Sequence, residues 1–485
     1  MISFSLSLVA LVLGYLFYGR FVERVFAPDN RMTPAVAKAD GLDFMVLPNW
    51  KIFMIQFLNI AGTGPIFGAI MGAKFGPVAY LWIVFGCIFA GAVHDYLSGM
   101  LSMRHGGAGL PELIGQYLGK TTKNIMLVFT VLLLIMVGTV FVYSPAEILH
   151  SIGGETMMWV AIIFVYYIIA TMLPIDKIIG KVYPLFAFSL LFMAGALMVW
   201  LFFHWPTIPE IWTNFYNMGA ATEPDKWTDA IFPALFITVA CGAISGFHAT
   251  QSPLMARCVQ SERMGRPIFY GAMITEGVVA LIWATVSAWF FYGEPAPGYE
   301  LIEKATAGFH TSAPAVVNLV CNDWLGVVGA ILAMLGVVAA PITSGDTAFR
   351  SGRLIVAEWL KLNQRPIINR LYICIPMFAC SIAMLIWQVE NPDGFNTIWQ
   401  YFGFSNQALS VFTLWTITVY LVRQKKAYWI TLIPALFMTT VCSTFLFVSK
   451  QAFHLPGNVG YILGGVCLVV ACVWFCIWYR KEVKK

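Results

Sequence analysis

Charged side chains are scarce in this chain. Asp, Glu, Lys and Arg make up 11% of its 485 residues, whereas a soluble domain carries about 25%. Hydrophobic residues make up 59% of the chain, and the mean hydropathy is +0.77. This composition excludes a soluble nucleotide-binding enzyme and predicts an all-α polytopic membrane protein. The net charge of +5 has an explanation in the membrane topology, so we do not interpret it as a sign of nucleic-acid binding.

Motifs of catalysis and cofactor binding are also missing. The sequence contains no Walker motif, no HExxH motif, no Ser-His-Asp order and no CxxC pair. Its ten cysteines lie almost entirely inside apolar runs, where small buried residues are expected. These absences argue against ATP-driven transport and against hydrolysis. We therefore expect neither enzymatic activity nor a bound cofactor.

Apolar runs of about 20 residues predict thirteen membrane-spanning helices. We expect them at residues 3–18, 52–71, 77–103, 124–143, 157–173, 183–203, 230–247, 267–291, 324–343, 367–387, 397–421, 428–448 and 459–478. Of the 29 Lys and Arg residues, all but four fall in loops on one side of this arrangement; the exceptions are Lys74, Lys226, Lys304 and Lys450. Since basic loops face the cytoplasm, the sequence predicts an amino terminus outside the cell and a cytoplasmic carboxyl terminus.

The second predicted span, residues 52–71, is interrupted at its middle by Ala61-Gly62-Thr63-Gly64-Pro65. A glycine costs about 1 kcal/mol inside a helix and a proline about 3 kcal/mol, so we expect two half-helices joined by an unwound turn. Unwound backbone inside a membrane protein needs hydrogen-bond partners, and a bound solute can supply them. We interpret the turn as half of a transport site. The alternative is a Gly/Pro kink that packs against a neighbouring helix.

The seventh predicted span, residues 230–247, is interrupted between Cys241 and Gly246. It lies five crossings after the first interrupted span and enters the membrane from the opposite side. Two such spans indicate an inverted repeat with a binding site between its halves. We therefore divide the chain into an extra helix and loop (1–51), a first five-helix repeat (52–204), a second five-helix repeat (205–422) and two further helices with the tail (423–485).

An anion is the expected ligand of the two turns, because the amino ends of half-helices carry partial positive charge. We predict that it binds backbone N–H groups of Gly62, Thr63, Gly64, Ser245, Gly246 and Phe247. His248 follows the second turn. It either contacts a substrate carboxylate or is a packing residue with one ring nitrogen hydrogen-bonded.

Two acidic residues inside predicted spans are candidates for proton coupling or gating. Glu276 lies roughly 13 Å into its helix at 1.5 Å per residue, where burial favours the neutral carboxyl that a proton-coupled carrier can use. A structural hydrogen bond from Glu276 to a neighbouring helix is the alternative. Asp95 lies toward the cytoplasmic end of its span, where it could gate against Arg104 or Arg257.

Two further charged residues belong to this group. Arg257 is expected to face the cytoplasm and could close the inner gate. Asp346 precedes Arg350 by four residues, and we expect a local ion pair between them.

Six sequence blocks are distinctive: IAGTGPIFG, FAGAVHDY, ITVACGAISGFHATQSPLMARC, FYGAMITEG, ITSGDTAFRS and IWQYFGFSNQALSVFTLWTITVYL. They resemble the signature blocks of the carbon starvation protein A family, and the resemblance runs in matching order from Arg31 to about Arg423. That family comprises bacterial inner-membrane proteins implicated in the uptake of peptides and of pyruvate. The resemblance implies a leucine-transporter-like five-plus-five fold. The count of predicted spans adds one extra helix before the repeats and two after.

The resemblance also implies a sodium site. In leucine-transporter-like proteins the third helix of the second repeat supplies a backbone carbonyl and two hydroxyls, and Ala340, Thr343 and Ser344 match that A-x-x-T-S pattern. Their partners would be carbonyls near Leu58 and Ala61, and oxygen ligands of this kind suit a hard cation. Alternatively, the two hydroxyls bond to carbonyls of their own helix.

We therefore expect a secondary-active symporter of the bacterial inner membrane. It would take up a small carboxylate such as pyruvate, or a short peptide, driven by Na⁺ or H⁺. A channel and a transporter-like nutrient sensor that use the same interrupted helices are the alternatives, although the sequence shows no signalling domain. The expected partners are the small-molecule substrate and the lipid bilayer, and a homo-oligomer is left open.

Overall fold

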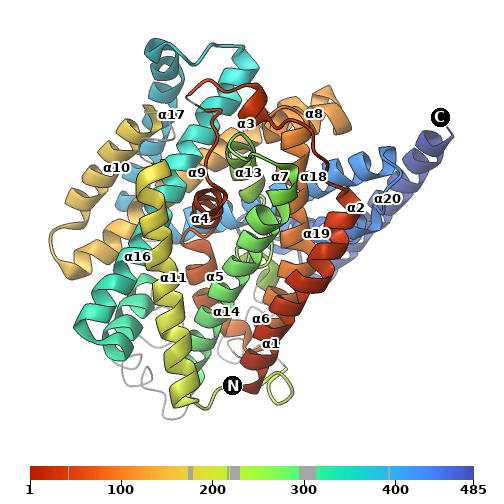
Figure 1. Cartoon of the computed structure of the whole chain (residues 1–485). Helices are drawn as coiled ribbons and strands as arrows, with labels where there is room; N and C mark the ends of the chain where they lie inside the picture. Colours follow the sequence, from red (N-terminus) through yellow and green to blue (C-terminus); the bar gives the residue numbers. More distant parts are fainter. Residues whose placement is uncertain are drawn as a thin grey trace.

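The computed structural model describes residues 1–41, 43–172, 179–215, 218, 230–293, 313–391 and 394–484. Every extended regular element in this part of the chain is a helix, as the composition predicts (Figure 1). Ten helical stretches there are long and apolar enough to cross a membrane: Ile2–Phe26, Asn49–Phe75, Val78–Arg104, Lys120–His150, Tyr183–His204, Glu262–Tyr292, Gly329–Leu360, Ile367–Glu390, Trp429–Val448 and Gly457–Val483. The chain is thus a multi-pass membrane protein.

These ten stretches coincide with ten of the predicted spans. The shorter apolar helix Thr156–Met172 coincides with the fifth, whose last residue, Leu173, lies outside the described residues. The eleventh predicted span lies in Gly394–Arg423, a long helix that is less apolar than the ten, and the seventh is interrupted. The count of thirteen crossings, the four-part division and the five-plus-five repeat remain predictions.

The first half of the chain contains eleven described α-helices. They are α1 (Ile2–Leu13), α2 (Gly19–Phe26), α3 (Pro34–Ala37), α4 (Asn49–Ile60), α5 (Gly64–Met71), α6 (Val78–Leu81), α7 (Ala92–Arg104), α8 (Leu110–Leu118), α9 (Lys120–Ile152), α10 (Thr156–Met172) and α11 (Ile179–His204). The 3₁₀ turn η2 (Gly72–Phe75) extends α5, and the π-helical segment η3 (Trp82–Gly91) joins α6 to α7.

The second half continues the all-helical pattern. Its described α-helices are α12 (Phe236–Thr238), α13 (His248–Ala256), α14 (Gly271–Tyr292), α16 (Ala313–Leu360), α17 (Ile367–Glu390), α18 (Gly394–Arg423), α19 (Trp429–Val448) and α20 (Gly457–Val483). Short turns lead into two of them, because η5 (Ile231–Leu235) precedes α12 while η6 (Glu262–Met264) and η7 (Arg266–Tyr270) precede α14.

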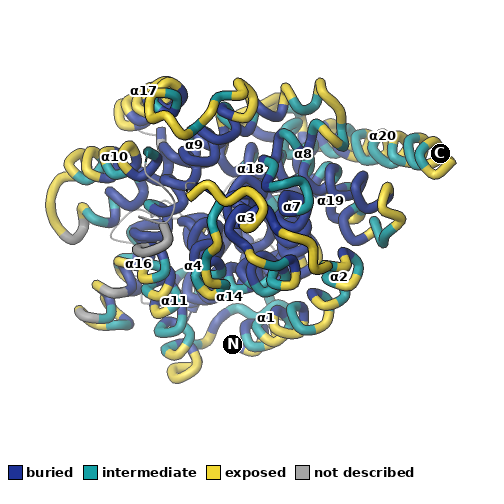
Figure 2. The backbone as a smooth tube through the Cα atoms, turned by 45° about the horizontal axis from the view of Figure 1, so that its top comes forward, coloured by how far each residue is buried: buried dark blue, intermediate teal, exposed yellow. Residues whose placement is uncertain are grey.

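The interrupted segments lie in the interior of the molecule. α4 packs against α11, α13 and α14, α5 packs against α14 and α16, and α13 packs against α7. Figure 2 shows buried backbone around α4, α7 and α18, with more exposed helices such as α10, α17 and α20 at the periphery. Only 11% of the most apolar stretch of α20 is buried, so its apolar side chains face outward as in a helix that contacts lipid. The peripheral helices therefore shield a core that holds the unwound backbone.

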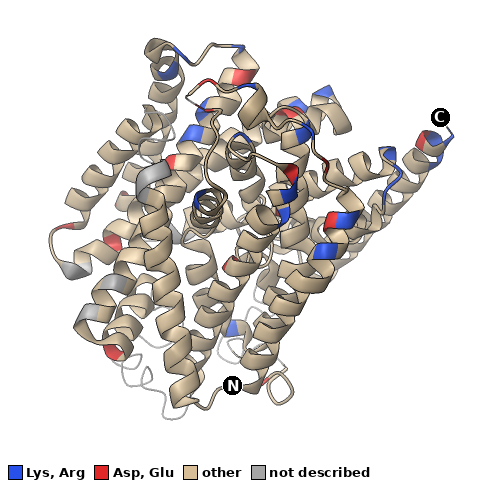
Figure 3. Cartoon of the chain, in the orientation of Figure 1, with Lys and Arg blue, Asp and Glu red and all other residues tan. Residues whose placement is uncertain are grey.

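Basic residues gather at one end of the molecule. Figure 3 shows Lys and Arg concentrated at the end where α3, α8 and the carboxyl terminus lie, which we call the basic end. The opposite end, where the amino terminus lies, carries few of them. Two of the four exceptional lysines, Lys226 and Lys304, lie outside the described residues. The distribution agrees with the separation of charges along the sequence.

A buried acid joins four segments at the basic end. Glu262 accepts hydrogen bonds from Arg104 Nε at 3.1 Å and Nη2 at 3.0 Å, and from the backbone N–H of Asp29 at 3.0 Å. Arg104 also donates to the Tyr420 hydroxyl at 3.1 Å and to the Ala27 carbonyl at 2.9 Å. The exposed Asp29 carboxylate accepts from Arg31, and these hydrogen bonds hold its pKa well below its ordinary value. The network ties the end of α2 to α7, η6 and α18.

This network generates a stability prediction. The Glu262 side chain is 1% exposed and that of Arg104 is 11% exposed, and removing one partner of a buried ion pair costs about 3–5 kcal/mol. We expect Glu262→Ala to lower the midpoint of thermal denaturation of the detergent-solubilised protein. Asp29→Ala is the control, because the Asp29 side chain is 47% exposed and exposed pairs contribute little. Equal midpoints for Glu262→Ala and the native protein would contradict the assignment.

Candidate substrate and ion site at two interrupted helices

The first break lies between α4 and α5. α4 ends at Ile60, Ala61 departs from helical geometry with φ −81° and ψ 54°, and α5 begins at Gly64. Pro65 occupies the first turn of α5, where its missing N–H group costs no intrahelical hydrogen bond. The Gly/Pro content of this span therefore correctly predicted two half-helices.

The second break is longer. α12 ends at Thr238 and α13 begins at His248, so residues 239–247 lack a continuous helix. Gly242 has φ +89°, a left-handed conformation that favours glycine, and a side chain there would collide with Ala280 of α14. The predicted interruption between Cys241 and Gly246 falls within this segment.

The two breaks lie against each other and away from lipid. A side chain at Gly64 would collide with Cys241, and a side chain at Gly72 would collide with Val239. Between them, Gly68 faces the Thr238 carbonyl, to which an added Cβ would approach within 3.0 Å. Glycine at every fourth position of a helix lets backbones approach closely, as in other membrane-helix contacts. α5 and the start of η2 therefore pack against the end of α12 and the second break through Gly64, Gly68 and Gly72, which we call the glycine face of α5.

Asn406 of α18 holds the second break in place. Its side-chain oxygen accepts hydrogen bonds from the Phe247 N–H at 2.7 Å and from the Ser245 hydroxyl at 3.0 Å. Its backbone carbonyl accepts from the Gly246 N–H at 3.1 Å. Asn406 is missing from the sequence-based candidates, although an Asn-Gln pair inside an apolar span is a signal that could have found it.

These hydrogen bonds change the expectation for the predicted anion ligands. The N–H groups of Gly246 and Phe247 donate to Asn406, and the Gly62 N–H donates to the Ile60 carbonyl at 3.0 Å. In this structure these three N–H groups are therefore bonded to protein acceptors and are not free to bind an anion. A role of these residues in substrate binding stays a prediction.

Four titratable residues form a buried chain beside the second break. His94 Nδ1 lies 2.7 Å from Asp95 Oδ1, and His248 Nδ1 lies 2.8 Å from Asp95 Oδ2. On its other side, His248 Nε2 lies 3.5 Å from Glu276 Oε2. Glu276 Oε1 accepts from the Gly242 N–H at 3.1 Å. All four side chains are fully buried, so the chain connects α7, α13 and α14 without contact to solvent.

The structure thus brings together three residues that the sequence indicated separately. Asp95 and Glu276 are acids inside predicted spans, and His248 is the residue that follows the second predicted interruption. The expectation that Asp95 pairs with Arg104 or Arg257 is wrong, because its carboxylate is enclosed by two histidines. The alternative considered for Glu276 was a hydrogen bond from its neutral carboxyl to a neighbouring helix; in the structure Glu276 Oε1 instead accepts a hydrogen bond from the Gly242 N–H in the second break.

The same place offers donor atoms for a metal ion. Cys241 Sγ and side-chain atoms of His248 and Glu276 lie within 4.8 Å of one another. The Asn406 amide nitrogen donates to the Cys241 sulfur at 3.9 Å, and the hydrogen bonds described above engage one atom each of His248 and Glu276.

Buried polar atoms without partners accompany the first break. Gln56 and Asn59 lie three residues apart on α4 and therefore share a face of the helix. The side-chain oxygen and nitrogen of each of these two residues lack a hydrogen-bond partner among the described residues, and so does the Thr63 hydroxyl. Leaving such groups unpaired costs about 1–3 kcal/mol each, so this region favours a polar ligand or water. Gln56 and Asn59 were also missed by the sequence reasoning.

The predicted sodium ligands meet in part. Ser344 Oγ donates to the carbonyls of Leu58 at 3.1 Å and of Asn59 at 3.0 Å, which joins α16 to the end of α4. Thr343 Oγ1 lies 2.9 Å from the Ala340 carbonyl of its own helix, so the back-bonding alternative holds for this hydroxyl. Ala61, next to Leu58 and Asn59, is fully buried at the start of the break. The sodium site itself stays a prediction.

The two remaining candidates have other partners than expected. The Asp346 carboxylate accepts a hydrogen bond of 2.5 Å from the Tyr183 hydroxyl of α11, and no ion pair with Arg350 occurs among the described residues. The predicted local pair is therefore wrong. Arg257 bonds to Glu358 at 2.6 Å and to the Gly107 carbonyl at 2.9 Å, which places it in a contact between α13 and α16 at the basic end.

An all-helical membrane protein with two interrupted helices packed together in its core is organised as a membrane transporter. The chain belongs to the carbon starvation protein CstA family, whose model matches residues 1–157, 142–327 and 300–445. The resemblance of the six sequence blocks is thereby confirmed.

Relatives support this membership along most of the chain. An uncharacterized membrane protein of Haemophilus influenzae is 45% identical over 60% of this chain and 91% of its own length. Peptide transporter CstA of Escherichia coli is 25% identical over 94% of this chain and 82% of its own length. Pyruvate/proton symporter BtsT of Escherichia coli is 25% identical over 91% of this chain and 80% of its own length.

A solved structure shares the fold. The crystal structure of the Eremococcus coleocola manganese transporter in complex with an aromatic bis-isothiourea substituted compound aligns with a TM-score of 0.56. The alignment covers 92% of this chain and 99% of that one, at 11% sequence identity. At this identity the likeness concerns the arrangement of helices alone.

The glycine face of α5 generates a prediction about activity. We expect Gly64→Leu to abolish transport while the protein still folds in membranes, because the new side chain would push Cys241 and the second break away from α5. Gly195→Leu on α11 is the matched control, because the space around its Cβ position is open. Substrate uptake and the elution profile of both purified variants check this. Native uptake by Gly64→Leu would contradict the placement of the site.

Proposed function

We propose that this protein is a proton-coupled carrier that takes up a small carboxylate, such as pyruvate, or a short peptide. The observation that carries the proposal is the buried chain His94, Asp95, His248 and Glu276, which ends on the unwound backbone of the second break. The names of two relatives, a peptide transporter and a pyruvate/proton symporter, support both substrate classes. Both kinds of substrate carry a carboxylate.

The substrate would bind at the first break. Thr63 precedes the amino end of α5, and its hydroxyl, like the amides of Gln56 and Asn59 in α4, has no partner among the described residues. A helix amino end attracts a carboxylate, and amide and hydroxyl groups can bond its oxygens or the neighbouring polar atoms of the substrate. Substrate binding would thus satisfy groups that the protein leaves without partners.

The proton would move along the chain beside the second break. If His248 Nδ1–H donates to Asp95, Nε2 carries the lone pair and faces Glu276 across 3.5 Å. A proton on Glu276 can then pass to Nε2, and the resulting imidazolium is stabilised by the Asp95 carboxylate. Since His248 begins α13 and Glu276 belongs to α14, a shift of α13 would open or close this transfer. Proton position and helix position are thereby coupled.

Sodium is the second candidate for the coupling ion. The contact of Ser344 Oγ with the Leu58 carbonyl supports it, because this contact places a hydroxyl and a carbonyl at the end of α4 as the predicted site requires. In either case we propose that the basic end faces the cytoplasm and that the protein resides in the bacterial inner membrane.

Reconstitution separates these possibilities. Labelled pyruvate and dialanine are offered to proteoliposomes under an inward proton gradient, an inward sodium gradient, or neither. We expect accumulation above the external concentration only with the proton gradient. Accumulation with the sodium gradient alone would identify Na⁺ as the coupling ion and would assign its binding to the region of Ser344. If uptake only equalises the substrate concentration on the two sides of the membrane, and its rate does not saturate with substrate, the protein is a channel and the carrier proposal is overturned.

Glu276→Gln tests the proton chain directly. Glutamine retains the size of the side chain and an oxygen that can accept from the Gly242 N–H, but it cannot release a proton. We expect loss of proton-driven accumulation, at least tenfold, with exchange of labelled for unlabelled substrate preserved. Glu112→Gln is the matched control, because Glu112 pairs with Lys123 on the surface at the basic end. Native accumulation by Glu276→Gln would remove Glu276 from the mechanism.

A further inference from the structure

Two arginines are buried in the part of α16 that leads toward the basic end. Arg350 is 0% exposed and Arg353 is 1% exposed, and their spacing of three residues places both side chains on one face of the helix. Arg350 Nη2 donates to the Ala170 carbonyl of α10 at 2.6 Å, and Arg353 Nη1 donates to Gln364 Oε1 at 2.6 Å. These hydrogen bonds hold both guanidinium groups in position.

The two guanidinium groups have unused donors. Nε and Nη1 of Arg350 and Nε of Arg353 are buried and lack a hydrogen-bond partner among the described residues. Asp43 Oδ1 lies 4.0 Å from Arg350 Nη1 and 3.6 Å from Arg353 Nη2, whereas a direct bond between such groups is about 2.7–2.9 Å long. Asp346, one turn before Arg350, accepts from Tyr183 instead. Two buried cations therefore face a carboxylate oxygen that is hydrogen-bonded to neither.

This arrangement has the chemistry of a carboxylate site. A buried charge is unfavourable unless it is paired and hydrogen-bonded, so the arginine pair favours an anion that reaches its remaining N–H groups. The planar guanidinium fork matches the two oxygens of a carboxylate. Asp43 supplies the right group at distances too long for direct bonds.

Asp43 belongs to a short segment, residues 43–48, which we call the strap. Backbone N–H groups of the strap donate to the carbonyls of Arg257 and Cys258 at 3.3 Å each, so the strap lies along the end of α13. α4 begins at the residue that follows the strap. A shift of α4 relative to α13 would therefore move Asp43 with respect to the arginine pair.

The arginine pair is also connected to the two breaks. Ser351 Oγ, next to Arg350, donates to the Thr250 carbonyl of α13 at 3.2 Å. Ser344 of the same helix contacts the end of α4, and Arg350 lies six residues further on, which is about 9 Å along the helix axis. α16 thus extends from the first break to the arginine pair.

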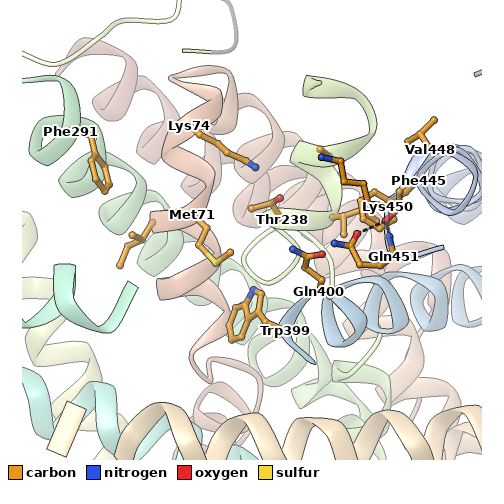
Figure 4. Close-up of a pocket in the computed structure, with 15 residues that line it drawn as sticks. Met71, Lys74, Thr238, Phe291, Trp399, Gln400, Phe445, Val448, Lys450 and Gln451 are labelled. Carbon is orange, nitrogen blue, oxygen red and sulfur yellow. Dashed lines mark hydrogen bonds between the residues drawn. The ribbon is translucent and has the colours of Figure 1, made fainter. Parts of the chain in front are cut away.

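The opposite end of the molecule has a pocket instead of a strap. This pocket has a volume of about 320 Å³ and is lined by residues of α5, α12 and α18, among them Met71, Thr238 and Trp399 (Figure 4). Met71 ends α5, and Thr238 ends α12 just before the second break. In this conformation the pocket adjoins the interrupted helices from one end, while the strap covers the arginine pair at the other.

We propose that Arg350 and Arg353 form a binding site for a small carboxylate anion, and that Asp43 occupies this site while the basic end is closed. When the strap moves with α4, the anion replaces Asp43 and bonds to the N–H groups that Asp43 does not reach. The inference rests on the proposed function only for the identity of the anion. It would be the carboxylate of the transported substrate, which meets the arginine pair after it leaves the first break.

Chemical rescue tests the site without requiring transport. Asp43→Ala removes the internal carboxylate, and the midpoint of thermal denaturation of the purified protein is measured with sodium acetate, sodium pyruvate, acetamide or sodium chloride. We expect acetate and pyruvate to raise the midpoint in a saturable way, at concentrations about tenfold lower than the native protein requires, because Asp43 competes with the anion in the native protein. Acetamide and chloride should affect the variant and the native protein equally.

A second variant covers the case in which Asp43→Ala does not fold. Asp43→Asn retains the size of the side chain and removes only its charge, so the same preference for carboxylates over acetamide is expected. Asp29→Ala is the matched control, because it removes an exposed acid at the same end. If neither Asp43 variant responds to carboxylates more strongly than the native protein does, the site is refuted.

Arginine variants assign the effect to the guanidinium groups. In the Asp43→Ala background, we expect Arg353→Gln to abolish the response to carboxylates and Arg353→Lys to retain part of it. Arg365→Gln is the control, because Arg365 is an exposed arginine at the same end. A response that survives Arg353→Gln, or that Arg365→Gln abolishes equally, would contradict the assignment.

Proteoliposomes separate this inference from the proposed function. Accumulation of pyruvate by the native protein, together with Asp43 variants that show no carboxylate response, would remove the anion site and leave the carrier intact. A carboxylate response that depends on Arg353, in a protein that accumulates neither pyruvate nor dialanine, would keep the anion site and remove the proposed function.

Discussion

Unwound backbone in the interior of a membrane protein must find hydrogen-bond partners, and this requirement governs the structure around the two breaks. An N–H or carbonyl group left without a partner in such a place costs several kcal/mol. At the second break side chains from other helices remove this cost. Asn406 accepts from Phe247, Glu276 accepts from Gly242, and Trp82 donates to the Val239 carbonyl at 2.8 Å. The break is therefore a defined structure held by α18, α14 and η3.

The same requirement links the fold to the proposed chemistry. Glu276 satisfies the backbone of the second break with one oxygen and faces His248 with the other. A proton that arrives on Glu276 changes the strength of its hydrogen bond to Gly242, since a carboxylate is the stronger acceptor. His248 starts the helix that follows the break, and its Nδ1 contacts Asp95 of α7. In the carrier that we propose, protonation of Glu276 and the position of α13 would therefore depend on the same few atoms.

Close backbone packing complements these hydrogen bonds. Gly64, Gly68 and Gly72 allow α5 to lie directly against the end of α12 and the second break. Among the described residues no ion pair crosses this contact, whereas α13 and α16 are joined at the basic end by Arg257 and Glu358. Apolar contact between small residues can separate without leaving charges unpaired.

The sequence by itself determined the local features. Apolar runs of sufficient length placed the helices, and glycine and proline placed both breaks, because helix propensity depends on neighbours in the chain. The scarcity of charge inside apolar spans made Asp95 and Glu276 stand out, and the position of the second break drew attention to His248. The repeat and the ligand roles of individual residues remain predictions at this level.

Only the tertiary structure decided the partners. Asp95 and His248 are 153 positions apart, and Ser245 and Asn406 are 161 positions apart. Spacing in the sequence could not choose His248 over Arg257 for Asp95, or Tyr183 over Arg350 for Asp346, because each choice depends on how distant helices rotate and pack. Asn406 escaped notice for the same reason, since an amide in an apolar span acquires its role from the backbone that lies opposite. Helix formation is a property of neighbouring residues, whereas the pairing of buried polar groups is a property of the assembled core.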